Sequence, residues 1–296
     1  MVGRSCSHRT FLIMPGMQTP PSTHRYARVL TIAGSDSGGG AGIQADLKTF
    51  AALGCYGTSA ITALTAQNTQ GVQAIHAVPA AFLKAQIQSV LDDIGTDAIK
   101  IGMLHTPEVA EVVAWAIAHY QPAHVVFDPV MVATSGDRLI AEETVAVLVR
   151  EVFPRASLIT PNLDEAAWLL GRPLRDPSQL QAAADELLAM GARAVLLKGG
   201  HLPGDEVVDL FVQPGQPSLR LASPRIASGN VHGTGCTLSS AIAAHLALGH
   251  GLSEAVRLAR GYILHAIESG APVQTGHGHG PLNHGFAPHA SHLKPL

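Results

Sequence analysis

The chain has 296 residues, of which 47% are hydrophobic and 14% are charged, and it contains 30 glycines. This composition excludes a disordered chain and allows a large buried core. The net charge of −3, with 19 basic and 22 acidic residues, and the 4% aromatic content argue against a nucleic-acid partner. Three scattered cysteines, Cys6, Cys55 and Cys236, exclude a disulfide scaffold and favour a cytoplasmic protein.

The two ends of the chain differ from the rest. Residues 1–27 lack apolar periodicity and are expected to form a disordered leader, in which the apolar run 11–14 is too short for a signal peptide. No later apolar stretch reaches the ~20 residues of a membrane span, so we expect a soluble protein with no membrane partner. Residues 285–296 are expected to form a flexible tail. A metal-binding role for the tail histidines is the weaker alternative, since no acidic or Cys partner accompanies them.

Short β-branched runs alternate with longer amphipathic segments between these ends. Strands are predicted at Arg28–Ala33, Thr58–Thr65, Asp97–Ile101, His124–Asp128, Ser157–Thr160 and Ala194–Lys198. Helices are predicted to begin near Gly42, Ala80, Pro107, Ala141, Asn162, Ser178, Thr234 and Ser253. The strands are continuously apolar, which is typical of strands covered on both faces. The pattern therefore predicts a single α/β domain over 28–284, with a mainly parallel central sheet and helices on both faces.

Ligands of such folds bind where the loops at the carboxyl ends of the strands converge. The polar loops at those ends are Gly34 to Asp36, Gln67-Asn68, Gly102-Met103, Asp128 to Val130, Pro161-Asn162 and Lys198 to Gly200. We expect these six loops to share one cleft.

The first of these loops is rich in glycine up to Gly42. Gly40 to Ala45 matches the GxGxxA form of the dinucleotide-binding pattern, which also needs a carboxylate at the end of the second strand. No Asp or Glu occurs between Asp46 and Asp92, which argues against NAD. A P-loop also fails, since no Lys-Ser or Lys-Thr pair directly follows the glycines. A loop that approaches a ligand and a tight turn without one both remain open.

A second glycine-containing segment, Asn230 to Cys236, leads into a predicted helix. The unpaired N–H groups of a helix N-terminus and two flexible glycines, Gly233 and Gly235, form a candidate site for an oxyanion or phosphate. Cys236 lies in the first turn, where the helix field is expected to lower its thiol pKa from ~8.5 toward about 3.5 to 7.5. It is a candidate base or nucleophile, and a small buried hydrophobic residue is the alternative.

Charged residues lie at or near the ends of three other strands. Asp128 and Glu165 are candidates to hold Mg²⁺ through water and so position nucleotide phosphates. Asn162 and Glu165 also have the spacing of an N-cap and its capping box, which would by itself explain both. Lys198 is either a solvated strand end or a phosphate contact.

Together, these segments resemble the hydroxymethylpyrimidine/phosphomethylpyrimidine kinase family of thiamine biosynthesis, within the ribokinase-like superfamily. The similar stretches are Thr31 to Asp36, Gly39 to Phe50, Ile61 to Leu64, Ala66 to Asn68, Lys100 to Leu104, Asp128 to Met131, Ser135 to Asp137, Leu158 to Asn162, Glu165-Ala166, Lys198 to His201, His232 to Ser239 and Gly276 to Pro281. They follow one another in order from about Arg28 to His284. Nothing functional is carried over to the two ends.

The resemblance implies a ribokinase-like fold and two ATP-dependent phosphorylations. The first converts 4-amino-5-hydroxymethyl-2-methylpyrimidine to its monophosphate, and the second gives the diphosphate. The implied acceptor-binding residues are Gln67, Gly34, Ala41, Asp46, Met103 and Val130. The implied catalytic residues are Cys236, Gly233, Thr234 and Gly235; Lys198, Asn162 and His232 are implied for ATP and phosphate binding; and Asp128 and Glu165 are implied for Mg²⁺.

The Gln67 assignment is chemically reasonable, because a carboxamide offers both a donor and an acceptor to an aminopyrimidine. Two alternatives to the pyrimidine kinase are a vitamin B6 kinase on the same scaffold and a non-catalytic binding protein. Either a monomer or a homodimer is compatible with the sequence.

Overall fold

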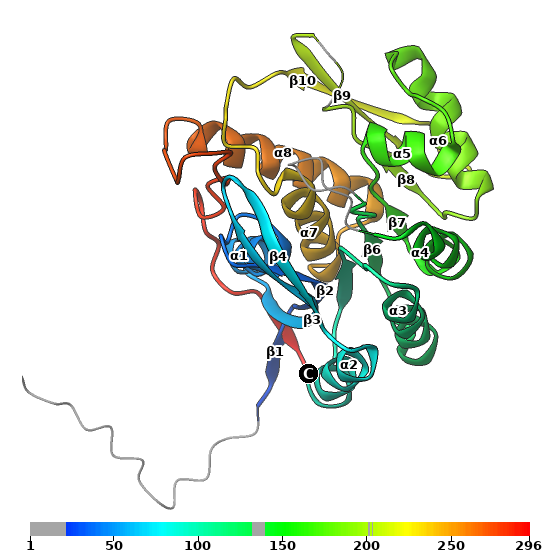
Figure 1. The fold of residues 1–296 in the computed structure, drawn as a ribbon. Coiled ribbons are helices and arrows are strands. Elements are labelled where there is room, and N and C mark those ends of the chain that lie inside the picture. Colours follow the sequence, from blue (N-terminus) through cyan, green and yellow to red (C-terminus); the bar gives the residue numbers. More distant parts are fainter. Residues whose placement is uncertain (1–21, 132–139, 201, 203) are drawn as a thin grey trace, which may run out of the picture.

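A nine-stranded sheet forms the middle of the molecule (Figure 1). The structure, a computed structural model, describes residues 22–131, 140–200, 202 and 204–296. Its strands are β2 (Arg28–Asp36), β3 (Tyr56–Asn68), β4 (Gly71–Ala77), β5 (Ala98–Ile101), β6 (Val125–Phe127), β7 (Leu158–Ile159), β8 (Val195–Leu197), β9 (Glu206–Val212) and β10 (Leu219–Pro224). The spatial order is β10-β9-β8-β7-β6-β5-β2-β3-β4. The strands from β8 to β3 are parallel, while β4, β9 and β10 are antiparallel to their neighbours.

Helices cover both faces of this sheet, as predicted. One face packs on α1 (Gly42–Ala52), α7 (Thr234–Ala247) and α8 (Leu252–Gly270). The other face packs on α2 (Ala80–Asp93), α3 (Pro107–Tyr120), α4 (Glu142–Val147), α5 (Leu163–Leu170) and α6 (Leu180–Ala189). Shorter helical turns occupy Leu148–Val152, Phe153–Arg155 and Pro177–Gln179. Each face has its own hydrophobic core. Helix α7 is buried along almost its whole length, because it packs against the sheet on one side and against α1 and α8 on the others.

The chain order reverses at β2, which lies between β3 and β5. Connections run to one side of β2 at the start of the domain and to the other side afterwards. A reversal of this kind opens a crevice at the carboxyl end of the strand, where ligands of α/β proteins bind. It places the loop that follows Gly34 at the centre of that crevice.

All six predicted strands are present, but the edges of the sheet differ from the prediction. The expectation that every strand is covered on both faces is wrong for the outer half of β3, from Leu64 onward, where exposed residues alternate with half-buried ones. That half forms a hairpin with β4, which is itself largely exposed. Strands β4, β9 and β10 were not predicted.

The chain ends lie close together in the described region. Strand β1 (His24–Tyr26) pairs antiparallel with β11 (Leu293–Pro295). The segment 285–296, for which a flexible tail is expected from the sequence, lies along the domain, and the N–H groups of His289 and His292 donate to the carbonyls of Ala52 and Gly54. Of the expected leader, residues 1–21 lie outside the described residues, as do Ser135 to Asp137 and His201 of the family-like stretches. Among the described helices, none combines the length and hydropathy that a membrane span requires.

Candidate active site

The carboxyl ends of the parallel strands open into a cavity of about 920 Å³. All six predicted loops contribute to its wall, including Gly34, Gln67, Met103, Val130, Asn162 and Lys198. The prediction that these loops share one cleft is confirmed. Ala41, His232 and the residues Gly233 to Cys236 also line the cavity.

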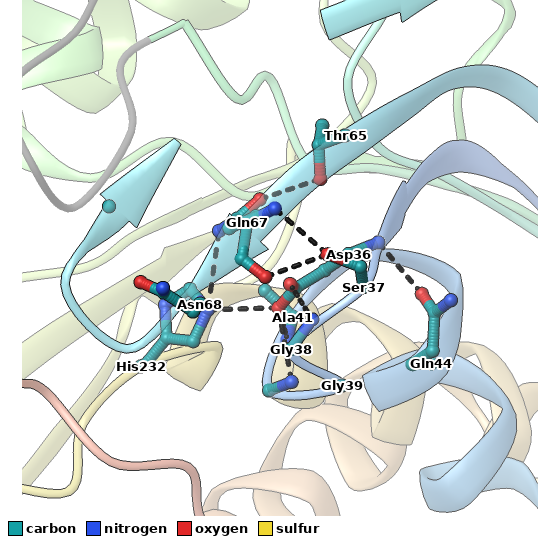
Figure 2. Close-up of polar contacts among 12 residues, drawn as sticks. Asp36, Ser37, Gly38, Gly39, Ala41, Gln44, Thr65, Gln67, Asn68 and His232 are labelled. Carbon is teal, nitrogen blue, oxygen red and sulfur yellow. Dashed lines mark hydrogen bonds and ion pairs between the residues drawn. The ribbon is translucent and has the colours of Figure 1, made fainter. Parts of the chain in front are cut away.

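The glycine-rich loop after β2 is folded around its own carboxylate. The N–H groups of Gly38, Gly40 and Ala41 donate to the Asp36 side chain at 2.8 to 3.0 Å (Figure 2). Burial alone would raise the pKa of Asp36, but a hydrogen bond with His232 and these backbone donors outweigh it and lower that pKa. The loop's N–H groups are thus already used by an internal anion, a role for Asp36 that sequence reasoning missed.

His232 and Gln67 face each other beside this loop (Figure 2). The Nε2 atom of His232 lies 3.0 Å from Asp36 Oδ2 and 3.4 Å from Gln67 Nε2. A single ring nitrogen cannot donate to the carboxylate and accept from the amide at once, and the nearer carboxylate is the better partner. The Thr65 hydroxyl lies 2.9 Å from the Ser35 carbonyl oxygen and 3.0 Å from Gln67 Oε1, so its single proton is shared between these two acceptors. The Gln67 amide thus makes only long or shared contacts in this wall and can exchange them for a ligand. His232, implied for phosphate binding, lies in the same wall as Gln67.

The first turn of α7 forms the floor between this wall and Lys198. Gly233 is the N-cap, with φ +85°, and a Cβ atom on it would lie 1.9 Å from the Gly40 carbonyl oxygen. Only glycine fits so close to the β2–α1 loop. A Cβ atom on Gly235 would lie 3.1 Å from Lys198 Nζ, so the lysine ammonium is next to the helix N-terminus. Helix N–H groups and an ammonium side by side form an anion site.

Lys198 is paired with Asp128 at the end of β6. Its Nζ lies 2.7 Å from Asp128 Oδ1, which also accepts from the Thr160 hydroxyl at 2.9 Å. Burial would lower the pKa of Lys198, but Asp128 outweighs that effect and raises it. Burial would likewise raise the pKa of Asp128, but Lys198 and Lys100 lower it. Both groups are therefore charged at neutral pH.

The Cys236 thiol behaves differently from the sequence expectation. It is half-buried in the first turn of α7. Desolvation raises its pKa to about 11; Lys100 opposes this rise, while the carboxylates of Asp46 and Asp128 add to it. The expectation of a lowered thiol pKa is wrong, because removal from water and two nearby anions outweigh Lys100 and the backbone hydrogen bond from Gly42.

Asp46 lies beneath the cavity floor rather than in the cavity wall. It is fully buried and accepts hydrogen bonds from Lys100 Nζ at 2.9 Å, from the Thr31 hydroxyl at 2.6 Å and from the Ser240 hydroxyl at 2.7 Å. Lys100, also fully buried, is the member of this cluster that lines the cavity. The implied direct contact between Asp46 and an acceptor is therefore not supported, and Lys100 is a site residue that sequence reasoning missed.

Asn162 and Glu165 form the capping box of α5, which confirms the structural alternative for this pair. The Asn162 N–H donates to Glu165 Oε2 at 2.7 Å, and the Glu165 N–H donates to Asn162 Oδ1 at 2.9 Å. Both residues also line the cavity. Burial raises the pKa of Glu165 to about 7; Lys198 opposes this rise and Asp128 adds to it.

A metal ion would need ligands beyond these side chains. Nowhere in the described chain do three His, Cys, Asp or Glu side chains gather closely enough to hold one. Mg²⁺ ordinarily keeps several waters and uses one or two carboxylates together with substrate phosphates. Asp128 and Glu165 fit that mode of binding, with phosphates at the neighbouring anion site.

The far end of the cavity is largely apolar. Ile226, Ile263, Leu264 and Ile267 line it, together with the buried pair Arg260–Asp209, whose Nε and Oδ2 atoms are 2.6 Å apart. Asp209 also accepts from the Gly199 N–H at 2.9 Å, which ties this wall to the turn after Lys198. Sequence reasoning missed this wall because two of the elements that build it, β9 and β10, were not predicted.

Comparison with known proteins identifies the family. Residues 36–283 match the family model described as phosphomethylpyrimidine kinase. This chain belongs to the phosphomethylpyrimidine kinase family. A hydroxymethylpyrimidine/phosphomethylpyrimidine kinase of Rhizobium meliloti is 50% identical over 87% of this chain and 97% of the relative. The thiamine biosynthesis bifunctional protein ThiED of Geobacter sulfurreducens is 52% identical over 86% of this chain, which spans 52% of that longer relative.

Solved structures of similar proteins confirm the ribokinase-like fold. A phosphomethylpyrimidine kinase of Clostridium difficile has 43% identity and a TM-score of 0.71 over 81% of this chain and 99% of its own. A Bacillus subtilis pyridoxal kinase in complex with ADP has 37% identity and a TM-score of 0.81 over 89% of this chain and 98% of its own. The sequence relatives and the solved structures therefore both support the kinase function that the sequence predicts.

Proposed function

We propose that this chain transfers the γ-phosphoryl group of ATP to 4-amino-5-hydroxymethyl-2-methylpyrimidine and then to the resulting monophosphate, giving the diphosphate for thiamine biosynthesis. Family membership and the name of the Rhizobium meliloti relative support this proposal. The observation that carries it is that one cavity wall contains both the amide of Gln67 and the anion site at the N-terminus of α7. The reaction needs ring recognition and phosphate binding side by side.

The acceptor ring is proposed to lie against Gln67, between Gly34, Ala41, Met103 and Val130. The amide of Gln67 would donate to a ring nitrogen, and its oxygen would accept from the exocyclic amine. Met103 and Val130 provide apolar contact for the ring faces. His232, whose ring is fixed by Asp36, is proposed to close the pocket beside Gln67.

The transferred phosphoryl group is proposed to lie at the first turn of α7. N–H groups of Gly233 to Cys236 would stabilise the charge that develops on its oxygens, and Lys198 would neutralise part of it. Asn162 is proposed to line the nucleotide phosphates. Mg²⁺, held by Asp128 and Glu165 through water, would supply further charge neutralisation.

Cys236 is proposed as the base for the first transfer only. The hydroxymethyl oxygen must lose a proton as its bond to phosphorus forms, whereas the phosphate oxygen of the second acceptor is already negative. With a pKa of about 11, roughly one thiol in 10⁴ is ionised at pH 7. The base role thus predicts a first transfer that accelerates as pH rises.

A vitamin B6 kinase is the second candidate, because the Bacillus subtilis pyridoxal kinase superposes closely on this fold. Its identity of 37% is lower than that of the pyrimidine kinases, which favours the pyrimidine acceptor. ATP turnover measured with the pyrimidine alcohol, its monophosphate and pyridoxal under identical conditions tests the choice. Faster turnover of pyridoxal than of both pyrimidines would overturn the proposal.

The proposal extends to a homodimer in the cytoplasm. Strand β4 is an edge strand, and Leu64 and Ile75 of the β3–β4 hairpin are 45% and 47% exposed. An exposed edge strand with apolar side chains is a natural pairing surface. The free thiols Cys55 and Cys236 fit a reducing compartment. Sedimentation velocity that gives the monomer mass at micromolar concentration would contradict the dimer.

A further inference from the structure

The segment Gly276 to Pro281, which follows α8, lies against the tip of the β3–β4 hairpin, although about 200 residues of the chain separate the two. Three consecutive residues of this segment donate backbone hydrogen bonds to Thr69, the first residue of the hairpin turn. The N–H groups of His277 and Gly278 donate to Thr69 Oγ1 at 3.2 and 3.1 Å, and the N–H group of His279 donates to the Thr69 carbonyl at 2.9 Å. Thr69 is therefore the anchor of the contact.

The alternating glycines of this segment are explained by that contact. A Cβ atom on Gly276, where φ is +73°, would lie 2.3 Å from Thr69 Oγ1, and one on Gly278 would lie 2.0 Å from the Thr69 carbonyl oxygen. A Cβ atom on Gly280 would lie 1.9 Å from Asn230 Oδ1. No side chain fits at any of these distances, so each glycine allows the backbone to approach another segment.

The same segment also holds the other wall of the acceptor pocket. The Gly280 carbonyl accepts from the His232 N–H at 3.1 Å, and His232 forms an isolated parallel bridge with Pro281. Asn230, two residues before His232, donates to the carbonyl of Gly270 at 2.8 Å. One end of the segment is thus fixed to the hairpin turn and the other to the loop that carries His232 and Gly233.

Gln67 and His232, which lie 3.4 Å apart, come from the two parts of the chain that the segment joins (Figure 2). Gln67 is two residues before Thr69 on the hairpin, where β3 and β4 are mostly exposed. Its backbone pairs with Val72 of β4, and the Ser37 hydroxyl contacts both the N–H and the carbonyl of Gln67. Within a single subunit, a hairpin with so few buried contacts is expected to move unless another segment of the chain holds it.

We propose that Gly276 to Pro281 is a positioning strap, with Thr69 as its anchor, that fixes the hairpin so that Gln67 and His232 meet the acceptor ring in one orientation. The inference rests on the proposed function, in which Gln67 binds that ring. Both acceptors carry the same ring, so the strap affects the binding of both equally. Thr69 does not line the cavity, so its substitution should leave nucleotide binding unaffected.

The test compares two substitutions in the full-length chain. Thr69→Val keeps the shape of the side chain and removes the oxygen that accepts from His277 and Gly278, whereas Thr69→Ser keeps that oxygen. Two weakened hydrogen bonds at an exposed site correspond to an increase of about five- to tenfold in the KM of the alcohol and of the monophosphate in Thr69→Val. We expect Thr69→Ser to stay within about twofold of the wild type. The kcat values and the affinity for ATP without acceptor should be unchanged in both.

Hydrogen exchange provides a readout that does not depend on activity. Thr69→Val should speed exchange in residues 66–72 and 276–281 and leave α3 unchanged, while Thr69→Ser should protect both segments as the wild type does. Unchanged acceptor KM, unchanged exchange, or equal effects of the two substitutions would overturn the strap. A failure of the proposed function would be distinct, because the wild-type protein would then turn over neither pyrimidine.

Discussion

The buried Asp46–Lys100 pair offers a sharp test of how the floor of the site is built. Both side chains are fully buried, and Asp46 receives hydrogen bonds from Lys100, Thr31 and Ser240. The substitution Asp46→Asn preserves shape and removes the charge, which leaves the Lys100 ammonium buried without its hydrogen-bonded carboxylate. Breaking one partner of a buried pair costs about 3–5 kcal/mol. For a domain of this size, that loss lowers Tm by roughly 6 to 20 °C.

The stability loss caused by Asp46→Asn should depend on pH, because it follows the ionisation of Lys100. Burial would lower the pKa of Lys100, but Asp46 outweighs it and raises that pKa above its usual value. In the wild type the pKa of Lys100 is higher in the folded than in the unfolded protein, where it is about 10.4. Charged Lys100 therefore stabilises the fold at pH values below about 10.4, and this contribution is lost only as pH rises through the folded-state pKa. In Asp46→Asn burial is opposed by the Asp128 carboxylate but no longer by Asp46, so the pKa of Lys100 falls and the penalty shrinks as pH rises toward about 10.4. The difference in unfolding free energy between the wild type and Asp46→Asn should therefore become smaller between pH 7 and 10.

Urea unfolding monitored by circular dichroism measures these differences. The double variant Asp46→Asn/Lys100→Met removes the unpaired charge and should recover much of the loss, because an apolar side chain tolerates burial. The exposed Asp185→Asn is the matched control and should change stability by less than about 0.5 kcal/mol. A loss below about 1 kcal/mol in Asp46→Asn, with no recovery in the double variant, would refute this account of the pair.

Four further predictions concern the cavity and the chain end. Gln67→Leu should weaken binding of the acceptor, at about 1–3 kcal/mol for each buried polar group left unpaired, and leave ATP binding intact, as measured by calorimetric titration. Cys236→Ala should slow phosphorylation of the alcohol by about 10² to 10⁴-fold and remove its rise with pH, with a much smaller effect on the monophosphate; equal losses in single-turnover rates would exclude the base role. The pKa of Glu165 is about 7 in the folded protein and about 4.5 when unfolded, so ionisation of Glu165 lowers the stability of the nucleotide-free protein as pH rises from about 4.5 to 7. In thermal scans, the Tm of Glu165→Gln should therefore change less with pH over this range than the Tm of the wild type. Deletion of residues 1–22 should leave folding and turnover intact, and a large fall in Tm would show that this segment packs on the domain.

The central elements could be predicted because their signals are local. Strands that are buried on both faces are continuously apolar, and helix starts carry their own marks, such as Pro107 after Thr106 and the Asn162–Glu165 capping box. The edge strands could not be read in the same way. The sequence of β4 contains few large apolar residues, and β10 alternates because one side is exposed. Of these edge strands, β9 alone carried a signal that a strand assignment could have used, in its mostly apolar run from Val207 to Val212.

The residues of the site could be located but their partners could not. A parallel sheet brings the ends of its strands to one edge whatever the side chains are, so Gln67, Met103 and Lys198 were placed in one cleft from topology alone. Pairing depends on contacts between distant segments. His232 meets Asp36 across 196 residues, and Lys100 meets Asp46 across 54, with no signal in the spacing of either pair.

Cys236 shows most clearly why position does not fix chemistry. The helix N-terminus acts on the thiol from its own chain segment, whereas desolvation and the carboxylates of Asp46 and Asp128 come from other elements and dominate. Nucleotide phosphates bound at the same turn would add negative charge and raise the thiol pKa further, so any ionisation of Cys236 would depend on the nearby cations Lys100 and Lys198. Because the second acceptor needs no base, the two transfers should respond differently to pH, with the alcohol favoured at alkaline pH relative to the monophosphate.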